Sequence, residues 1–212
     1  MILLMAVLGV DVGLKSLSIC IVSDDMILKW GVYNILDSEQ VLCEICGRKA
    51  KYKQGFCGIH FKGEKLKKNE IKTKKVKSFS LQDIASKIID LLDDLTQDPC
   101  FLEVEKVIIE LQPKCNPKMC FCSNVIFTKL CDYYKESEVK IKFERASVKL
   151  KKYKGDKGLF VENTYSNRKK KSIEYVECQI KRYQQEMQDF FTGLKKKDDA
   201  SDSFLLAFNN LC

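Results

Sequence analysis

The sequence lacks a long hydrophobic run. Although 45% of its 212 residues are hydrophobic, the apolar stretch that opens the chain covers only residues 1–10 before Asp11 interrupts it. A bilayer-spanning helix needs about 20 apolar residues, and a signal peptide would show a basic start and a small-residue cleavage site. We therefore expect no membrane partner and interpret this stretch as a buried strand.

A disulfide pattern is also absent. The chain has 11 cysteines, an odd number, and they do not form the dense framework of a small secreted domain. This usage favours a reducing compartment, so we expect an intracellular, cytoplasmic protein. It also makes metal ligation the leading use of any cysteines that cluster.

Glycine is scarce, and this argues against one class of ATPase. The motif VDVGLKS around Asp11 is compatible with the first phosphate loop of an actin-like ATPase or a sugar kinase, a fold that needs a second glycine-rich loop. Of the 10 glycines, only Gly155, Gly158 and Gly193 follow Gly63, which is too few for a second glycine-rich loop in the other half of such a fold. A chain of 212 residues is also too short for two such domains.

The positive charge is concentrated in two stretches. The formal net charge is +8, but residues 48–77 hold 12 Lys/Arg against 2 Asp/Glu, and residues 149–171 hold 9 against 2. The rest of the chain is acidic. Local basic patches of this kind predict a polyanionic partner, and the alternative for either stretch alone is a solvated lysine-rich loop.

Segment 40–78 has little apolar periodicity but clusters four potential metal ligands. Cys43 and Cys46, followed after ten residues by Cys57 and His60, have the paired spacing of a structural zinc site. Bound zinc would supply folding energy that the segment otherwise lacks. We expect a lysine-rich zinc-binding module inserted into one domain that spans residues 1–212, and the alternative is four reduced side chains in a loop. We interpret a second, irregularly spaced group as buried structural thiols: Cys115, Cys120, Cys122 and Cys131.

The remaining periodicity predicts an α/β fold. Three β-rich runs, 5–12, 17–23 and 27–35, predict an antiparallel meander, which opens the RNase H-like topology. Helical and strand patterns then alternate, so we expect a mixed sheet flanked by helices. Residues 149–171 are interpreted as a loop. The expected helices are 80–95, 124–134, 172–191 and 199–211, and the later strands are 104–110 and 139–144.

Acidic residues interrupt two of these apolar strands. A buried Asp11 would cost several kcal/mol unless a metal or a donor compensates it, and Gly9 and Gly13 leave room beside it for a ligand or another backbone. Glu110 ends the apolar run 107–109. Either residue could instead be an ordinary strand-end acid.

A third acidic feature opens the C-terminal helix. Asp199 and Asp202 lie at positions i and i+3, on one helical face. The alternative is an N-cap and first-turn acid pair formed by Asp198 and Asp199. Together with Asp11 and Glu110, the pair Asp199 and Asp202 offers the four oxygen ligands that two Mg²⁺ or Mn²⁺ ions need, one to activate water and one to stabilise the leaving 3′ oxygen of a phosphodiester.

Four ordered motifs resemble those of the RuvC-like Holliday junction resolvases, and most closely the poxvirus-type branch. They are VLGVDVGLKS, VIIELQP, RKKKS and KKKDDASDSFLLAF, and the resemblance covers most of the chain outside residues 40–78. It implies a dimeric, metal-dependent endonuclease that nicks four-way DNA junctions symmetrically. It also extends the expected cytoplasmic location to a viral replication site in the host cytoplasm. Residues 80–95 or 172–191 could form the dimer interface.

The resemblance also implies roles for single residues. Asp11, Glu110, Asp199 and Asp202 match the four acidic metal ligands, and a lysine near the scissile phosphate matches one of Lys169, Lys170 and Lys171, with Lys170 favoured. We expect further DNA contacts from Lys149, Lys151, Lys152, Lys154, Arg168, Lys169 and Lys171. Two other functions stay open: an RNase H-like or flap nuclease acting on other branched DNA, and a non-catalytic zinc-containing DNA-binding scaffold.

Overall fold

The computed structural model describes residues 5–36, 42–48, 50–63, 70, 78–152 and 164–211, except for the side chain of Tyr165. Lys154, one of the expected DNA contacts, lies outside the described residues. The chain divides into two compact units, Met1–Ile35 together with Leu81–Cys212, and Leu36–Ser80.

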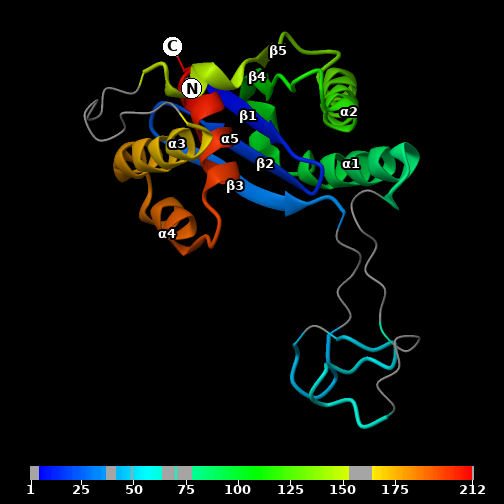
Figure 1. Cartoon of the computed structure of the whole chain (residues 1–212). Helices are drawn as coiled ribbons and strands as arrows, with labels where there is room; N and C mark the ends of the chain where they lie inside the picture. Colours follow the sequence, from blue (N-terminus) through cyan, green and yellow to red (C-terminus); the bar gives the residue numbers. More distant parts are fainter. Residues whose placement is uncertain are drawn as a thin grey trace. The chain divides into compact units, whose positions relative to one another are not determined.

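The larger unit is built on a five-stranded mixed sheet with the order β3-β2-β1-β4-β5 (Figure 1). β1 (Ala6–Val12), β2 (Ser16–Val22) and β3 (Ile27–Asn34) form the predicted antiparallel meander, and each bound lies within one residue of the expected one. β4 (Val104–Glu110) and β5 (Lys140–Glu144) continue the sheet in parallel. The expected α/β fold with a mixed sheet is confirmed.

Helices lie on both sides of this sheet (Figure 1). α1 (Leu81–Leu95) and α2 (Pro117–Tyr133) pack against each other on one side. α3 (Tyr165–Gln179), α4 (Gln185–Gly193) and α5 (Asp198–Phe208) lie on the other. None of the described helices is both long and apolar enough to cross a membrane.

Two helices begin earlier than predicted. α2 begins at Pro117 instead of residue 124, because the Asn116 side chain caps it by accepting a hydrogen bond from the Met119 N–H, and proline suits the first turn. α3 begins at Tyr165, inside the predicted loop 149–171, where Thr164 caps it in the same way. The first turn of α3, which includes Ser166, Asn167 and Arg168, is polar and carries no apolar periodicity, so the pattern did not reveal it.

The predicted helix 172–191 is two helices. α3 ends in a 3-10 turn, Ile180–Arg182, and Tyr183 is extended before α4 starts. Because the apolar positions of both helices face the same core, their spacing imitated one continuous helix.

α5 crosses directly over β1 at Gly9. A Cβ atom at this position would lie 2.1 Å from the Ser203 carbonyl oxygen, so only glycine allows the approach. The Ser203 hydroxyl also hydrogen-bonds with that of Ser18 on β2 at 2.8 Å, and the Trp30 indole N–H donates to the Ala200 carbonyl at 3.1 Å. The room beside β1 therefore accommodates another backbone, one of the two expectations for Gly9.

The described residues of the smaller unit form turns and isolated β-bridges. Tyr52, only 2% exposed, forms isolated β-bridges with Phe56 and Glu70, and its ring stacks on Phe61 with 4.0 Å between ring centroids. Gly47 and Gly55 adopt positive φ angles of 63° and 79°, which residues with a Cβ atom rarely adopt. Glycine at these positions therefore permits the tight turns. The packing centres on one buried aromatic ring.

Candidate functional site

The strand register brings Asp11 and Glu110 together. Gly9 of β1 pairs with Ile108 of the parallel strand β4. Asp11 and Glu110 each follow two residues later, so both side chains point to the same face of the sheet as the vacant Cβ position of Gly9. That face is the one covered by α5.

Asp202 and Lys149 complete this cluster. Asp202 precedes Ser203, the residue of α5 that lies over Gly9. The Lys149 ammonium lies 3.4 Å from Asp11 Oδ1, 3.0 Å from Glu110 Oε1 and 2.8 Å from Asp202 Oδ2, and the Lys149 side chain is only 4% exposed. Three acids that are far apart in the sequence thus surround one buried cation.

Lys149 is held by the turn that follows β5. It lies in a 3-10 turn, Ala146–Leu150, and its carbonyl oxygen accepts a 2.7 Å hydrogen bond from the Asn209 side chain at the end of α5. We expected Lys149 to contact DNA from a loop, whereas the structure buries its ammonium. Its apolar neighbours Val148 and Leu150, directly after the strand next to β4, are the signal that could have revealed this position.

Burial and mutual charge shift the pKa values in the cluster. Burial raises the pKa of Asp11 well above its usual range, and that of Asp202 less strongly, although Lys149 opposes both shifts. Burial also acts to raise the pKa of Glu110, but its interactions with Asp11 and Lys149 outweigh this and lower it. Burial would lower the pKa of Lys149, yet the three carboxyl groups raise it, so the lysine stays protonated.

The fourth expected metal ligand, Asp199, has other partners. It lies one helical turn before Asp202 and accepts hydrogen bonds from the Ser16 hydroxyl at 3.0 Å and from Lys196 at 2.9 Å. Asp198 is more buried and pairs with Lys169 of α3. Both acids lie in the first turn of α5.

The remaining expected DNA contacts differ in exposure. Lys151 and Lys152 are exposed directly after Lys149. On α3, Arg168 and Lys170 are exposed, whereas Lys169 and Lys171 are half-buried. Lys170, which we favoured from the sequence as the active-site lysine, is therefore more exposed to solvent than Lys169 and Lys171.

The smaller unit brings together all four expected zinc ligands. The ligand atoms of Cys43, Cys46, Cys57 and His60 lie within 4.8 Å of one another, close enough to hold a metal ion. His60 Nδ1 lies 3.5 Å from Cys43 Sγ and 3.6 Å from Cys57 Sγ. Burial acts to raise the pKa of Cys43, but hydrogen bonds from backbone N–H groups, first that of Cys57, and from His60 lower it to about 5. The thiolate is the form that binds metal.

The larger unit has the fold of the RuvC-like resolvases. The crystal structure of the fowlpox virus resolvase with Holliday junction DNA matches with a TM-score of 0.53 at 17% identity, covering 96% of this chain and 95% of that one. Thermus thermophilus RuvC matches with a TM-score of 0.51 at 12% identity, covering 97% of this chain and 92% of that one. The expected RuvC-type class is confirmed for the fold.

The family match is more specific. The family described as "Poxvirus A22 protein" matches residues 58–212, more than half of the chain, so the chain belongs to this family. The protein L451 of Acanthamoeba polyphaga mimivirus is 29% identical over 188 residues, which are 76% of this chain and 45% of L451. The chain thus spans about half the length of that curated relative.

Proposed function

We propose that this protein is a viral endonuclease that resolves Holliday junctions by metal-dependent phosphodiester hydrolysis. The observation that carries the proposal is the meeting of Asp11, Glu110 and Asp202 around one buried cationic group. Membership of the poxvirus A22 family and the shared fold of a resolvase bound to junction DNA support the same function.

The acids of this cluster suit Mg²⁺ or Mn²⁺. Carboxylate oxygens are hard ligands, and three carboxyl groups carry more negative charge than the Lys149 ammonium neutralises when they are ionised. A bound metal pair would activate water and stabilise the leaving 3′ oxygen. Asp11, Glu110 and Asp202 would hold the ions, and Asp199, one helical turn before Asp202, would be the fourth ligand.

Lys149 is the lysine that we assign to the reaction. Its ammonium already lies between the carboxylates, and its raised pKa keeps it charged at neutral pH. A protonated lysine here would bind the negative charge of a phosphate at the site. Lys170, exposed on α3, is better suited to contact the DNA backbone outside the cluster.

We assign structural Zn²⁺ to the smaller unit. Three thiols and one imidazole are the ligand set of a closed tetrahedral zinc site, and all four ligand atoms already lie close together. Zinc there would add folding free energy to a unit whose described residues pack around Tyr52.

Two further properties follow from the proposed reaction. Cutting two strands symmetrically requires two active sites, so we propose a homodimer. The exposed Lys151, Lys152 and Arg168 would bind DNA phosphates, so junction affinity should fall steeply with salt. We also propose that the protein works in the cytoplasm, where its thiols stay reduced.

Strand-resolved cleavage of a synthetic four-way junction in Mg²⁺ tests this function. We expect paired, symmetrical nicks from the unaltered protein and from a control, Asp25→Asn, which changes an exposed acid in the turn before β3. Asp202→Asn should bind the junction without cutting it. Junction binding without cleavage by the unaltered protein would favour a DNA-binding scaffold, and preferential cutting of RNA–DNA hybrid or flaps would favour the other nucleases.

A further inference from the structure

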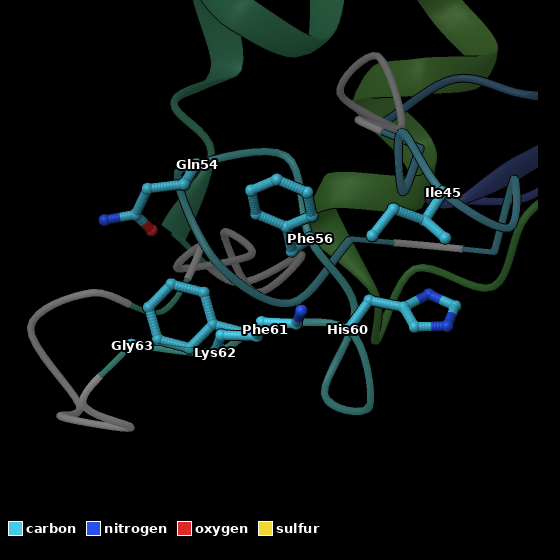
Figure 2. Close-up of a pocket in the computed structure, with 7 residues that line it drawn as sticks. All are labelled: Ile45, Gln54, Phe56, His60, Phe61, Lys62 and Gly63. Atoms are coloured by element: carbon cyan, nitrogen blue, oxygen red, sulfur yellow. The ribbon is translucent and has the colours of Figure 1, made fainter.

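The smaller unit carries an apolar hollow beside its cysteine and histidine cluster. The hollow has a volume of about 340 Å³ and is lined by the rings of Phe56 and Phe61 and by Ile45, with Lys62 beside them (Figure 2). This volume lies at the small end of the usual range for ligand pockets, about 300–1,000 Å³. The ligand it fits is therefore small or is one inserted group of a larger molecule.

Two residues that line the hollow, His60 and Phe61, have further contacts with neighbouring side chains of the unit. The Phe61 ring stacks on the buried Tyr52, at 4.0 Å between centroids and 18° between planes. His60, which also lines the hollow, has its Nδ1 atom beside the Cys43 and Cys57 thiols. The rings of Phe61 and His60 are thus held in place before a ligand binds, which lowers the entropic cost of binding.

The net charge of the unit that carries the hollow indicates the class of ligand. The unit Leu36–Ser80 holds 12 of the chain's 37 Lys/Arg and only 5 of its 29 Asp/Glu. Among the described residues, Lys62 lines the hollow, and Lys53 is an exposed neighbour of Gln54, which lines it too. An apolar peptide needs no such charge, whereas a nucleic acid presents phosphates and flat bases at once.

We propose that the smaller unit binds unpaired DNA, with one base inserted into the hollow against Phe56 and Phe61 and the lysines on the backbone phosphates. Aromatic side chains in a basic groove bind single strands in this way without reading sequence. The choice of DNA as the polymer rests on the proposed nuclease function. The base-binding site itself does not, because no residue of the acidic cluster contributes to it.

The test compares two single strands that carry the same phosphates. A thymine oligonucleotide and an abasic strand of equal length are titrated by fluorescence anisotropy onto the zinc-loaded full chain, without added magnesium. Since a stacked base adds affinity, we expect the thymine strand to bind at least about fivefold more tightly. Equal affinities would overturn the proposal and leave the hollow to an apolar protein segment.

Matched variants locate the effect in the hollow. Phe56→Ala and Ile45→Ser should lower affinity for the thymine strand and leave affinity for the abasic strand unchanged. Ile59→Ser is the control, because Ile59 is an equally apolar, 73% exposed residue of the same unit that is not among the lining residues. An equal loss in Ile45→Ser and Ile59→Ser would overturn the proposed position.

Zinc content and junction cleavage separate this inference from the function on which it rests. Each variant should retain bound zinc, which shows that the unit remains folded. If cleavage by the unaltered protein is normal but the two strands bind equally, only the base-binding site is wrong. If the thymine strand binds more tightly but no junction is cut, the nuclease function is wrong and the site stands.

Discussion

The two units of this chain differ in what holds them together and in the charge they carry. The larger unit buries strands and helices around rings such as Trp30 and Phe204, whereas the smaller one gathers three thiols and an imidazole. The smaller unit holds 12 Lys/Arg against 5 Asp/Glu, which leaves 25 against 24 for the rest of the chain. The cluster of Asp11, Glu110 and Asp202 thus lies in the larger unit, and most of the net positive charge lies in the smaller one.

The largest expected effect concerns the smaller unit. Removing zinc with a chelator, or changing Cys57→Ser, should unfold it, because structural zinc contributes about 10–16 kcal/mol in comparable peptides. Hydrogen exchange should show lost protection of the Gly47 and Phe61 amides, which donate to the Cys43 and Cys57 carbonyl groups in the turns of this unit. Protection of the amides in β1 and β4 should not change. Loss of amide protection in both units would contradict the view that zinc stabilises the smaller unit alone.

Glu110→Gln should affect the larger unit and leave the smaller one unchanged. It removes a carboxylate from the acidic cluster, so junction cleavage should fall by well over about 100-fold, more than the loss typical of residues that only support a metal ligand. The bound zinc per chain, measured by atomic emission, should not change. A variant that still cuts at a tenth of the normal rate would exclude Glu110 as a metal ligand.

Lys149 and Lys170 provide a matched pair of lysines within the larger unit. Lys149→Met should lower the single-turnover cleavage rate by about 100-fold, the cost of removing one group that stabilises charge in a transition state. Lys170→Met should mainly weaken junction binding and lower its salt dependence. The reverse result would return the catalytic role to Lys170.

Gly9→Ala should destabilise the larger unit alone. The new methyl group would meet the Ser203 carbonyl at 2.1 Å and force α5 away from β1, at a cost of about 1–3 kcal/mol. Gly193→Ala is the control, since a Cβ there meets nothing within 4 Å. Denaturant unfolding should separate the two variants, and equal midpoints would contradict the close crossing.

The smallest expected effect is on acid stability. A hydrogen bond from Lys29, joined by those from Cys100, lowers the pKa of Asp98 from 3.8 to about 2. Because the folded-state pKa is the lower one, this pair stabilises the protein above about pH 4 and its contribution is lost as the pH falls toward 2. The Asp98 side chain is 39% exposed, so the contribution should stay below about 1 kcal/mol. In Asp98→Asn, the melting temperature should depend less on pH in this range. A dependence equal to that of the unaltered protein would contradict the pairing.

The sequence alone determined features that depend on neighbours along the chain. Strand bounds followed from apolar runs. The clustering of Cys43, Cys46, Cys57 and His60 followed from their spacing, because two pairs of residues on tight turns can meet locally. The buried positions of Asp11 and Glu110 also followed, since each interrupts or ends an apolar strand. Helix starts at polar turns, such as Thr164, did not follow, because caps leave no apolar periodicity.

Only the tertiary structure decided which groups meet at the site. Asp11, Glu110 and Asp202 converge because β4 pairs beside β1 and α5 crosses at Gly9, contacts between segments that are far apart in the sequence. The burial of Lys149 depends on the turn after β5 and on the hydrogen bond from Asn209. A lysine in a basic run has the same local sequence whether it is solvated or buried, so only packing could distinguish Lys149 from its neighbours.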